Sequence, residues 1–433
     1  MNEAFLHYVW QHQMIVGKMV TVDGQPVVVE KVGELNSDSG PDFVNSLLEI
    51  GGVRWSGCVE IHVKSSDWNI HNHTFDKAYN NVILHVVYEH DVDVHTQSGV
   101  CPPVIELKRY IPIELWSRYE QLLSWSKQEA VACSAELSSI PKFFISTYLE
   151  RLAVERLEQK SRVVNDMLED SKGDWETCIY WLMAKYFGGM ANAFPFELLA
   201  KNTPLNLLAR YKDDRDKIEA LLLGQAGLLY GHFCDDYPRK LQIEYEALRK
   251  GYGLKPISAC LWKFFRMRPS SFPTIRISQF ASLLSSSSNL FSRFVETTDV
   301  HGLEDFFDVK SADYWVSHYQ FDKQSKNIKK NVGRMFADTL IINAWVPLLF
   351  VYGCSHDNQE MKDRAIMMLQ QLAPEKNKVV NMWKTCGIEV SNAADTQALL
   401  QLYNSYCKER RCIDCHIGFK VMNDTNVHAV DGN

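Results

Sequence analysis

Residues 43–64 read FVNSLLEIGGVRWSGCVEIHVK. Two runs of mostly alternating apolar and polar residues flank a glycine pair at 51–52, which is the pattern of a β-hairpin. Because side chains alternate along a strand, Glu60, His62 and Lys64 are expected on one face and the intervening aliphatic residues on the other. Three ionisable groups in a row indicate either a solvated face or a functional site.

The neighbouring segments extend this hairpin into a sheet. Valine-rich runs on both sides of Asp23-Gly24 predict a second hairpin. Residues 82–88, VILHVVY, are apolar enough for a strand that is buried on both faces, and His85 within it is expected to be a hydrogen-bonded core histidine. We therefore expect strands within residues 20–30, 43–64 and 82–89, preceded by a short helix at residues 3–14.

The pattern changes after Pro112. Residues 113–128 and 141–168 carry a helical apolar period, and helix-like segments continue to the end of the chain. The sequence thus predicts an α+β protein. A small β-rich N-terminal domain at residues 1–112 is followed by a large all-α domain at residues 113–433, which ends in a cysteine cluster.

The composition is that of a globular protein. The 433-residue chain has a formal net charge of −7, with 46% hydrophobic residues, so any contact with nucleic acid would need a local basic patch. Its longest apolar stretch, Leu340–Tyr352, is too short to span a bilayer. The N-terminus lacks a secretory pattern, and the eleven cysteines are scattered as in reduced proteins. These features predict a cytoplasmic protein without a membrane partner and leave its oligomeric state open.

Reactive side chains are densest between Glu34 and His85. Six of the fourteen histidines fall between His62 and His95, and imidazole is a common metal ligand. The candidate catalytic residues are Asp42, Glu60, His62 and Lys64. The candidate ligands of a divalent metal, Mg²⁺ or Mn²⁺, are Asp42, Glu60, His71, His73 and Asp76, with Glu34 in the pocket wall. Alternatively, such side chains near turns cap backbone groups and bind no metal.

A second candidate site lies near the end of the chain. Cys407, Cys412 and Cys415 form a C-x₄-C-x₂-C motif, and thiolates at such short spacing suit Zn²⁺ or an iron–sulfur cluster. If they bind zinc, the three sulfurs should converge to within about 4 Å of one another. The candidates for a fourth ligand are Cys386 or Cys354, and after them His416. The alternative is three buried thiols that pack as small apolar groups.

Several motifs resemble one known family. They are GPDF at 40–43, WSGCVEIH at 55–62, SDW at 66–68, RMRPSSFPTIRISQFASLL at 266–284 and YCKERRCIDCHIG at 406–418. Together they resemble a bacterial family known only as domain of unknown function 2851, over nearly the whole chain. No activity follows from this resemblance.

A weaker resemblance suggests a mechanism. The residues PD at 41–42 and EIH at 60–62 resemble the motif of PD-(D/E)xK nucleases, in which two acidic residues bind Mg²⁺ and a lysine stabilises the reacting phosphate. The resemblance implies a restriction-endonuclease-like fold for the N-terminal domain and a metal between the two acidic residues. Here His62 stands where the lysine is expected, and Lys64 lies two residues further along the same face.

The register of the hairpin bears on this resemblance. A strict two-residue turn would place Asp42 opposite Ile61, on the wrong face of the sheet. An extra residue in the second strand would bring Asp42 across from Glu60 or His62. Gly57 is the candidate position for this bulge.

The favoured hypothesis is a metal-dependent, nuclease-like phosphodiesterase that acts on nucleic acid. The first alternative is an enzyme of another class, in which His62, His71 and His73 bind Zn²⁺ or Fe²⁺. The second alternative is a non-catalytic protein whose helical body is a binding scaffold. From the sequence alone, it stays open whether the protein is an enzyme.

Overall fold

The computed structural model describes residues 1–36, 38–286 and 290–423. The chain divides into two compact units. The N-terminal unit comprises Met1–Ile145 together with the C-terminal segment from Tyr403 onward, and the helical unit comprises Ser146–Leu402. This division differs from the predicted one at residue 112, because α3 (Ile113–Gln128) and the cysteine segment belong with the sheet.

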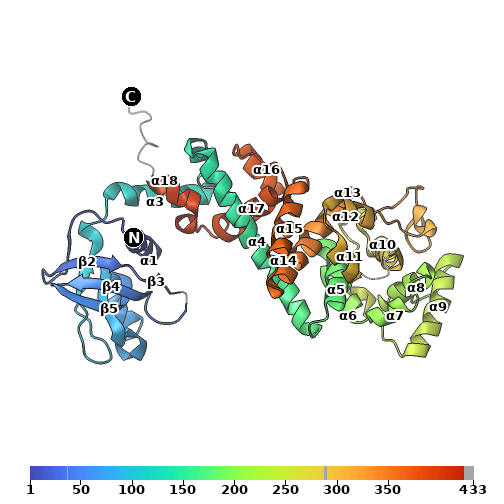
Figure 1. Ribbon diagram of the computed structural model, residues 1–433, viewed down its shortest axis with the longest axis horizontal. Coiled ribbons are helices and arrows are strands. Elements are labelled where there is room, and N and C mark those ends of the chain that lie inside the picture. Colours follow the sequence, from blue (N-terminus) through green and yellow to red (C-terminus); the bar gives the residue numbers. More distant parts are fainter. Residues whose placement is uncertain (37, 287–289, 424–433) are drawn as a thin grey trace. The chain divides into compact units, whose positions relative to one another are not determined.

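The N-terminal unit is built on one mixed sheet, and the helical remainder of the chain confirms the predicted α+β class. The strand order is β1-β2-β4-β5-β6-β7, with β3 beside β4, and Figure 1 shows β2, β4 and β5 side by side. The strands are β1 (Met19–Val20), β2 (Pro26–Lys31), β3 (Glu34–Leu35), β4 (Phe43–Ile50), β5 (Val53–Lys64), β6 (Val82–Glu89) and β7 (Val104–Glu106). Pairs up to β4–β5 are antiparallel, whereas β5–β6 and β6–β7 are parallel.

The connection from β5 to β6 carries most of the histidine segment. A parallel pair needs a crossover, and here it consists of three short helices: α2 (Asp67–Ile70), η1 (His73–Phe75) and η2 (Lys77–Asn81). Trp68 and Tyr79 anchor the crossover by packing with Val82 and Val94 in a buried cluster. Both α2 and η2 contact β5, so the histidines of this segment stay close to that strand.

The β4–β5 hairpin forms around the predicted glycine turn. Its register shifts near the start of β4, where Ser46 pairs with Gly57 but Phe43 pairs with Val59. Three steps along β4 therefore match two steps along β5, which means that β4 carries one extra residue. Asn45 lies inside this bulge with a left-handed φ of 58°.

The bulge confirms one expectation and corrects another. An extra residue is present, but it lies in the first strand of the hairpin and not in the second. It brings Asp42, one residue before β4, level with Glu60 instead of Ile61. Gly57 has a different role from the predicted one. A Cβ on Gly57 would lie 2.6 Å from the carbonyl oxygen of Asn81, so the close approach of the crossover requires glycine.

Helix α1 (Glu3–Gln11) forms where a short helix was predicted. It contacts β5 of the sheet. Phe5 packs on two aromatic rings of α3, and Tyr8 contacts Phe419 of α18 (His416–Asn423). The first helix is therefore held between the sheet and helices from two other parts of the chain.

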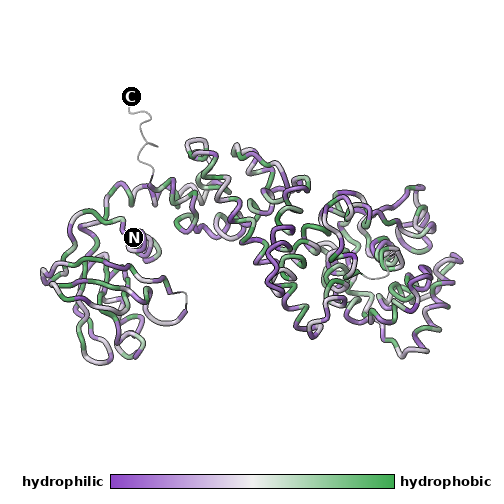
Figure 2. Tube along the Cα trace, in the orientation of Figure 1, coloured by the Kyte–Doolittle hydropathy of each residue, from purple (hydrophilic) through white to green (hydrophobic). Residues whose placement is uncertain are grey.

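The helices of the helical unit form where the sequence carries a helical period of apolar residues. Figure 2 shows hydrophobic and hydrophilic residues alternating along its helices, as expected for amphipathic segments. The helices are α4 (Lys142–Asp170, which begins in the N-terminal unit), α5 (Trp175–Phe187), α6 (Gly189–Lys201), α7 (Leu205–Ala209), α8 (Arg215–Gln225), α9 (Asp236–Tyr252), α10 (Pro273–Ser286), α11 (Leu290–Glu296), α12 (Val300–Phe307), α13 (Arg334–Leu340), α14 (Val346–Ser355), α15 (Gln359–Gln371), α16 (Lys378–Thr385) and α17 (Ala393–Leu402). In the described part of this unit, the strands are two short ones, β8 (His318–Gln320) and β9 (Lys323–Gln324).

One helical stretch among the described residues, Arg334–Ser355, is long and apolar enough to cross a membrane. It comprises α13, a π-helical turn at Ile341–Trp345, and α14. Within its most apolar window, 67% of the residues are buried. This is the burial expected of a core helix.

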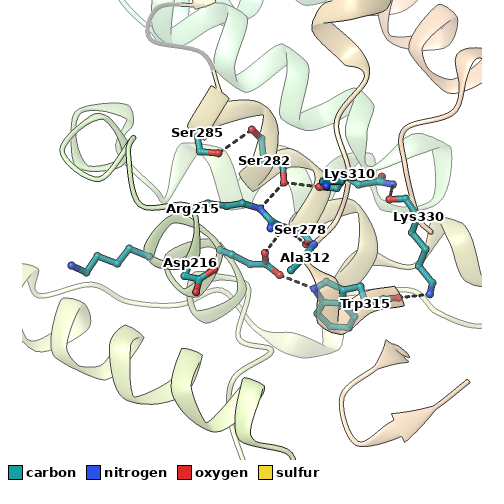
Figure 3. A network of polar contacts seen from close by, with 12 residues as sticks. Arg215, Asp216, Ser278, Ser282, Ser285, Lys310, Ala312, Trp315 and Lys330 are labelled. Carbon is teal, nitrogen blue, oxygen red and sulfur yellow. Dashed lines mark hydrogen bonds and ion pairs between the residues drawn. The ribbon is translucent and has the colours of Figure 1, made fainter. Parts of the chain in front are cut away.

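A polar network lies in the interior of the helical unit (Figure 3). Glu219 of α8 is fully buried, accepts a hydrogen bond from Trp315 Nε1 (2.7 Å) and lies 3.2 Å from Arg215. Arg215 also donates to Ser282 Oγ of α10 (2.7 Å). Burial raises the pKa of Glu219, whereas Trp315 and Arg215 oppose this shift. The network therefore compensates a carboxylate that is removed from water.

Candidate metal site

Asp42 and Glu60 meet across the start of the β4–β5 pair. The Asp42 N–H donates to Glu60 Oε2 (3.0 Å), and the Ile61 N–H donates to Asp42 Oδ2 (2.9 Å). Each carboxylate is thus fixed by a backbone donor from the opposite segment. Glu60 is only 4% exposed. Burial raises the pKa of its carboxyl, His73 opposes this shift, and the charge of Asp42 adds to it.

Three histidines converge beside Glu60. His62 lies two residues further along β5, His71 follows the last residue of α2, and His73 begins η1. Asn72 adopts a left-handed conformation (φ 64°), and this kink lets the rings on both sides of it approach His62. One ligand atom from each histidine lies within 4.8 Å of the other two. The crossover and β5 thus form the site together.

The distances between the histidine nitrogens and the Glu60 oxygen match those between ligands of one metal ion. His62 Nε2 lies 3.1 Å from His71 Nδ1, and Glu60 Oε1 lies 3.5 Å from His62 Nε2 and 3.2 Å from His73 Nε2. Ligands bound at about 2.1 Å to a tetrahedral zinc ion are about 3.4 Å apart. His73 Nε2 is buried beside this Glu60 oxygen. Its lone pair and the Glu60 oxygen can therefore face the same cation.

His85 supports His62 from the neighbouring strand β6. It is fully buried, as predicted for a core histidine, and its Nε2 lies 2.9 Å from His62 Nδ1. Burial, reinforced by neighbouring histidines, lowers the pKa of His62 to about 2 and that of His85 to about 3. Both rings are therefore neutral near pH 7. When His62 donates from Nδ1, its Nε2 lone pair is available on the side of His71, which is the tautomer that a metal ligand requires.

Helix α1 adds two residues, His7 and Glu3, that were not predicted from the sequence. His7 Nε2 lies 3.2 Å from Asp42 Oδ2. Burial favours the neutral ring, but the contact with Asp42 outweighs it and raises the pKa of His7. Glu3 lies one helical turn earlier, and burial raises the pKa of its carboxyl. Their spacing of four residues on the polar face of a helix was the available signal.

The remaining predicted residues lie outside this cluster. Asp76 is exposed and caps η2 by accepting a hydrogen bond from the Ala78 N–H (2.9 Å). Glu34 is exposed and pairs with a neighbouring lysine (3.0 Å). Lys64 is exposed at the end of β5. The structure therefore brings together two of the predicted carboxylates and all three predicted histidines.

A cavity of about 630 Å³ borders this site. Its lining includes His7 and Gln11 from α1, and Arg411, Asp414 and Phe419 from the C-terminal segment. His7, which lines this cavity, also contacts Asp42, so the cavity adjoins the carboxylate pair.

The C-terminal cysteines belong to the same unit but are not part of the histidine cluster. Cys407, Cys412 and Cys415 line a second cavity. They are not among the groups of described residues whose ligand atoms lie within 4.8 Å of one another. The expected convergence of the three sulfurs to about 4 Å is thus not met. Cys386 and Cys354, the preferred fourth ligands, belong to the helical unit.

The sequence as a whole matches a family described as "Protein of unknown function (DUF2851)", over residues 3–378. The chain belongs to this family. The match includes the sheet, the histidine crossover and most of the helical unit, and it ends before the cysteine segment. No curated protein and no solved structure matches the chain.

Proposed function

We propose that the N-terminal unit is a divalent-metal-dependent hydrolase whose metal is bound by His62, His71 and His73. The observation that carries this proposal is the convergence of three imidazole ligand atoms within 4.8 Å, beside the buried carboxylate of Glu60. Lone pairs that face one another repel unless a proton or a cation lies between them. A divalent cation relieves this repulsion for all of these groups at once.

The ligand chemistry selects the kind of metal. Mg²⁺ prefers oxygen ligands, whereas imidazole suits zinc and iron. The three histidines therefore favour Zn²⁺ or Fe²⁺ over the Mg²⁺ or Mn²⁺ expected from the carboxylates alone. Three protein ligands also leave a coordination position open, as in catalytic zinc sites.

The chain supplies the proton transfers. A metal bound by the three histidines would lower the pKa of a water molecule at the open position. Glu60 Oε1 lies 3.2 Å from His73 Nε2 and can accept the proton of such a water molecule, a role that its raised pKa suits. His7, held beside Asp42, can donate a proton to the leaving group.

We assign the substrate as a phosphodiester of nucleic acid. Two features support this assignment. The first is the resemblance of residues 41–42 and 60–62 to the PD-(D/E)xK motif, and the second is the β4 bulge, which sets Asp42 level with Glu60 as that motif needs. We propose that Lys64, which is exposed at the end of β5, contacts a phosphate of the substrate. Histidine ligands make this site a variant of that motif.

Metal analysis of the purified full-length chain tests the metal site. We expect about one equivalent of zinc or iron per chain, and loss of most of it in His73→Ala. His95→Ala is the matched control, because His95 is an exposed histidine of the same unit that lies outside the cluster. Metal content that is unchanged in a folded His73→Ala protein would contradict the proposal.

Hydrolysis assays on DNA, RNA and a simple phosphodiester test the reaction. Glu60→Gln keeps the size of the side chain and an acceptor for the Asp42 N–H, so it should retain the metal and the fold. We expect it to lower kcat by about 10²-fold or more, because a general base is lost. If the wild-type protein holds the metal but cleaves none of these substrates, the nuclease assignment fails, and a zinc or iron enzyme of another class replaces it.

A further inference from the structure

A stretch without acidic residues runs through the helical unit. No aspartate or glutamate stands between Glu246 and Glu296, whereas eight lysine or arginine residues do. The chain as a whole carries a formal net charge of −7, so this stretch is a local excess of positive charge. An acidic protein that contacts nucleic acid needs a basic patch of this kind.

Residues 262–268 of this stretch form a loop, here called the basic loop, that is anchored on the helical unit. Trp262 is buried and donates from Nε1 to the Ala226 carbonyl oxygen (2.7 Å). The side chain of Asn192, in α6, accepts a hydrogen bond from the Lys263 N–H (2.9 Å) and donates to the Lys263 carbonyl oxygen (3.0 Å). The loop is therefore held in place without a ligand, which lowers the entropic cost of binding one.

The basic loop exposes its charged side chains and one aromatic ring. Lys263, Arg266 and Arg268 are exposed, and in the described part of the chain none of them forms an ion pair with a carboxylate. Phe265 is 82% exposed, and the guanidinium carbon of Arg266 lies 5.2 Å from the centre of its ring. The loop thus offers three positive charges without a neighbouring negative partner, together with an aromatic surface.

A second basic segment meets this loop through Phe272. The ring of Phe272 lies 5.2 Å from that of Phe264 in the loop and 6.5 Å from that of Tyr319 in β8. Residues 323–337, which follow β8, also contain no aspartate or glutamate. The exposed lysines of this segment are Lys323, Lys326 and Lys329. The positive charge of the loop is therefore continued by a separate part of the chain.

This combination of charges and an aromatic ring fits a single strand of nucleic acid. Phosphates repeat along a strand, so several cations can each neutralise one of them. An unpaired base can stack on an exposed aromatic ring, whereas the bases of a duplex already stack on one another. A membrane surface fits less well, because it requires a broad apolar face. In residues 262–268, Phe265 is the one apolar side chain that is exposed.

We propose that the basic loop of the helical unit binds single-stranded nucleic acid. Phe265 stacks on a base, and the three exposed cations of the loop contact phosphates. The lysines that follow β8 contact the strand further along. The inference rests on the proposed function in one respect, which is that the bound strand is the substrate of the hydrolase. The binding itself needs no metal.

The affinity of the full-length protein for a fluorescent oligothymidine, measured with a chelator present to prevent cleavage, tests this proposal. The triple variant Lys263→Gln/Arg266→Gln/Arg268→Gln removes the three charges of the loop. We expect it to weaken binding by about 10-fold or more and to reduce the slope of log affinity against log salt concentration by about 2. Its thermal unfolding should match that of the wild type, because all three side chains are exposed.

The matched control removes the same charge elsewhere in the helical unit. It is the triple variant Lys376→Gln/Lys378→Gln/Lys384→Gln, whose lysines are exposed and lie in or next to α16. Figure 1 shows α16 apart from α10, the helix that follows the basic loop. The control should bind with the affinity of the wild type. Equal weakening in both triple variants, or a wild-type protein that does not bind, would overturn the proposal.

Two substitutions of Phe265 distinguish stacking from apolar insertion. Phe265→Tyr keeps an aromatic ring and should bind as the wild type does. Phe265→Leu keeps an apolar side chain but cannot stack, so we expect it to weaken binding by about 5- to 100-fold. A duplex of the same length should bind more weakly than the single strand. Equal affinities of the two variants, or binding to phosphatidylserine vesicles but not to the oligonucleotide, would overturn the proposal.

Binding and hydrolysis can fail independently. His73→Ala should bind the oligonucleotide with wild-type affinity, because His73 belongs to the other unit. A wild-type protein that binds the oligonucleotide but cleaves no phosphodiester would support the binding loop and contradict the hydrolase. Cleavage of a simple phosphodiester by a protein without affinity for the oligonucleotide would support the hydrolase and overturn the binding loop.

Discussion

One exposed residue, Asn45, sets the register on which the carboxylate pair depends. Its left-handed backbone adds a residue to β4 and turns Asp42 toward Glu60. The sequence indicated that a bulge was needed, but it pointed to Gly57, because glycine is the commoner signal. Asparagine is the other residue that tolerates this conformation, so an asparagine within an alternating strand was the sequence signal for the bulge.

At Asn45, the size of the Cβ substituent should decide stability. Asn45→Gly should leave the free energy of unfolding within about 0.5 kcal/mol, because glycine adopts a left-handed φ readily. Asn45→Val should destabilise the protein by about 1–2 kcal/mol, because a β-branched residue is strained there. Denaturant unfolding of both variants checks this. Equal stability would show that the bulge imposes no conformational demand.

The neutral pair of His62 and His85 predicts how pH acts on the metal-free protein. The unfolded chain binds protons on both rings as pH falls below 6.5, whereas the folded rings stay neutral down to about pH 2–3. Stability should therefore fall as pH falls through this window, by up to about 1.4 kcal/mol per pH unit for each histidine. His85→Gln should make the slope shallower in denaturant unfolding at several pH values. A slope equal to that of the wild type would refute the assignment.

At the scale of elements, the sequence predicted the strands and helices that carry their own local signal. The β4–β5 hairpin, the doubly buried β6 and helix α3 each carry a complete period or turn signal. Strands β3 and β7 were missed, because two or three residues are too short to show an alternation. The place of His7 in the site was also hidden, since it depends on how α1 packs against β5.

The contact between β5 and the crossover makes Gly57 sensitive to a single methyl group. In Gly57→Ala the new Cβ would meet Ile83 Cγ2 at 2.5 Å and the Asn81 carbonyl oxygen at 2.6 Å. We expect a loss of about 1–3 kcal/mol in the free energy of unfolding. Gly251→Ala is the control, because open space surrounds this glycine in α9, and it should be neutral or stabilising by up to about 1 kcal/mol. Similar effects at both positions would argue against the close approach.

At the scale of the whole molecule, the division into two units was the feature that the sequence predicted least well. The change of pattern after residue 112 marks where strands give way to helices, but α3 and the segment from Tyr403 complete the N-terminal unit. Local periodicity does not show which helices pack on which sheet, because that choice depends on contacts between residues far apart in the chain. For the same reason, the sequence did not show that Cys133 lines one cavity with Cys407, Cys412 and Cys415.

The buried network of the helical unit predicts a stability effect that is separate from the metal site. Arg215→Met should cost about 3 kcal/mol, because it leaves the carboxylate of Glu219 buried without its cationic partner. The double variant Arg215→Met/Glu219→Leu should recover much of this loss. Thermal unfolding measures both, while metal content should stay at the wild-type level. A double variant less stable than the single one would show that the carboxylate is favourable even without Arg215.

The contact of α1 with α18 has a consequence for synthesis on the ribosome. Tyr8 packs on Phe419, and its hydroxyl accepts a hydrogen bond from Asn423 Nδ2 (2.9 Å). At the usual pace of translation, α1 emerges roughly 20–80 s before these partners. During that interval the Tyr8 side of α1 lacks these partners and is available to chaperones, while the helical unit is being made. A prematurely terminated chain would therefore carry every histidine of the site on an N-terminal unit that lacks α18.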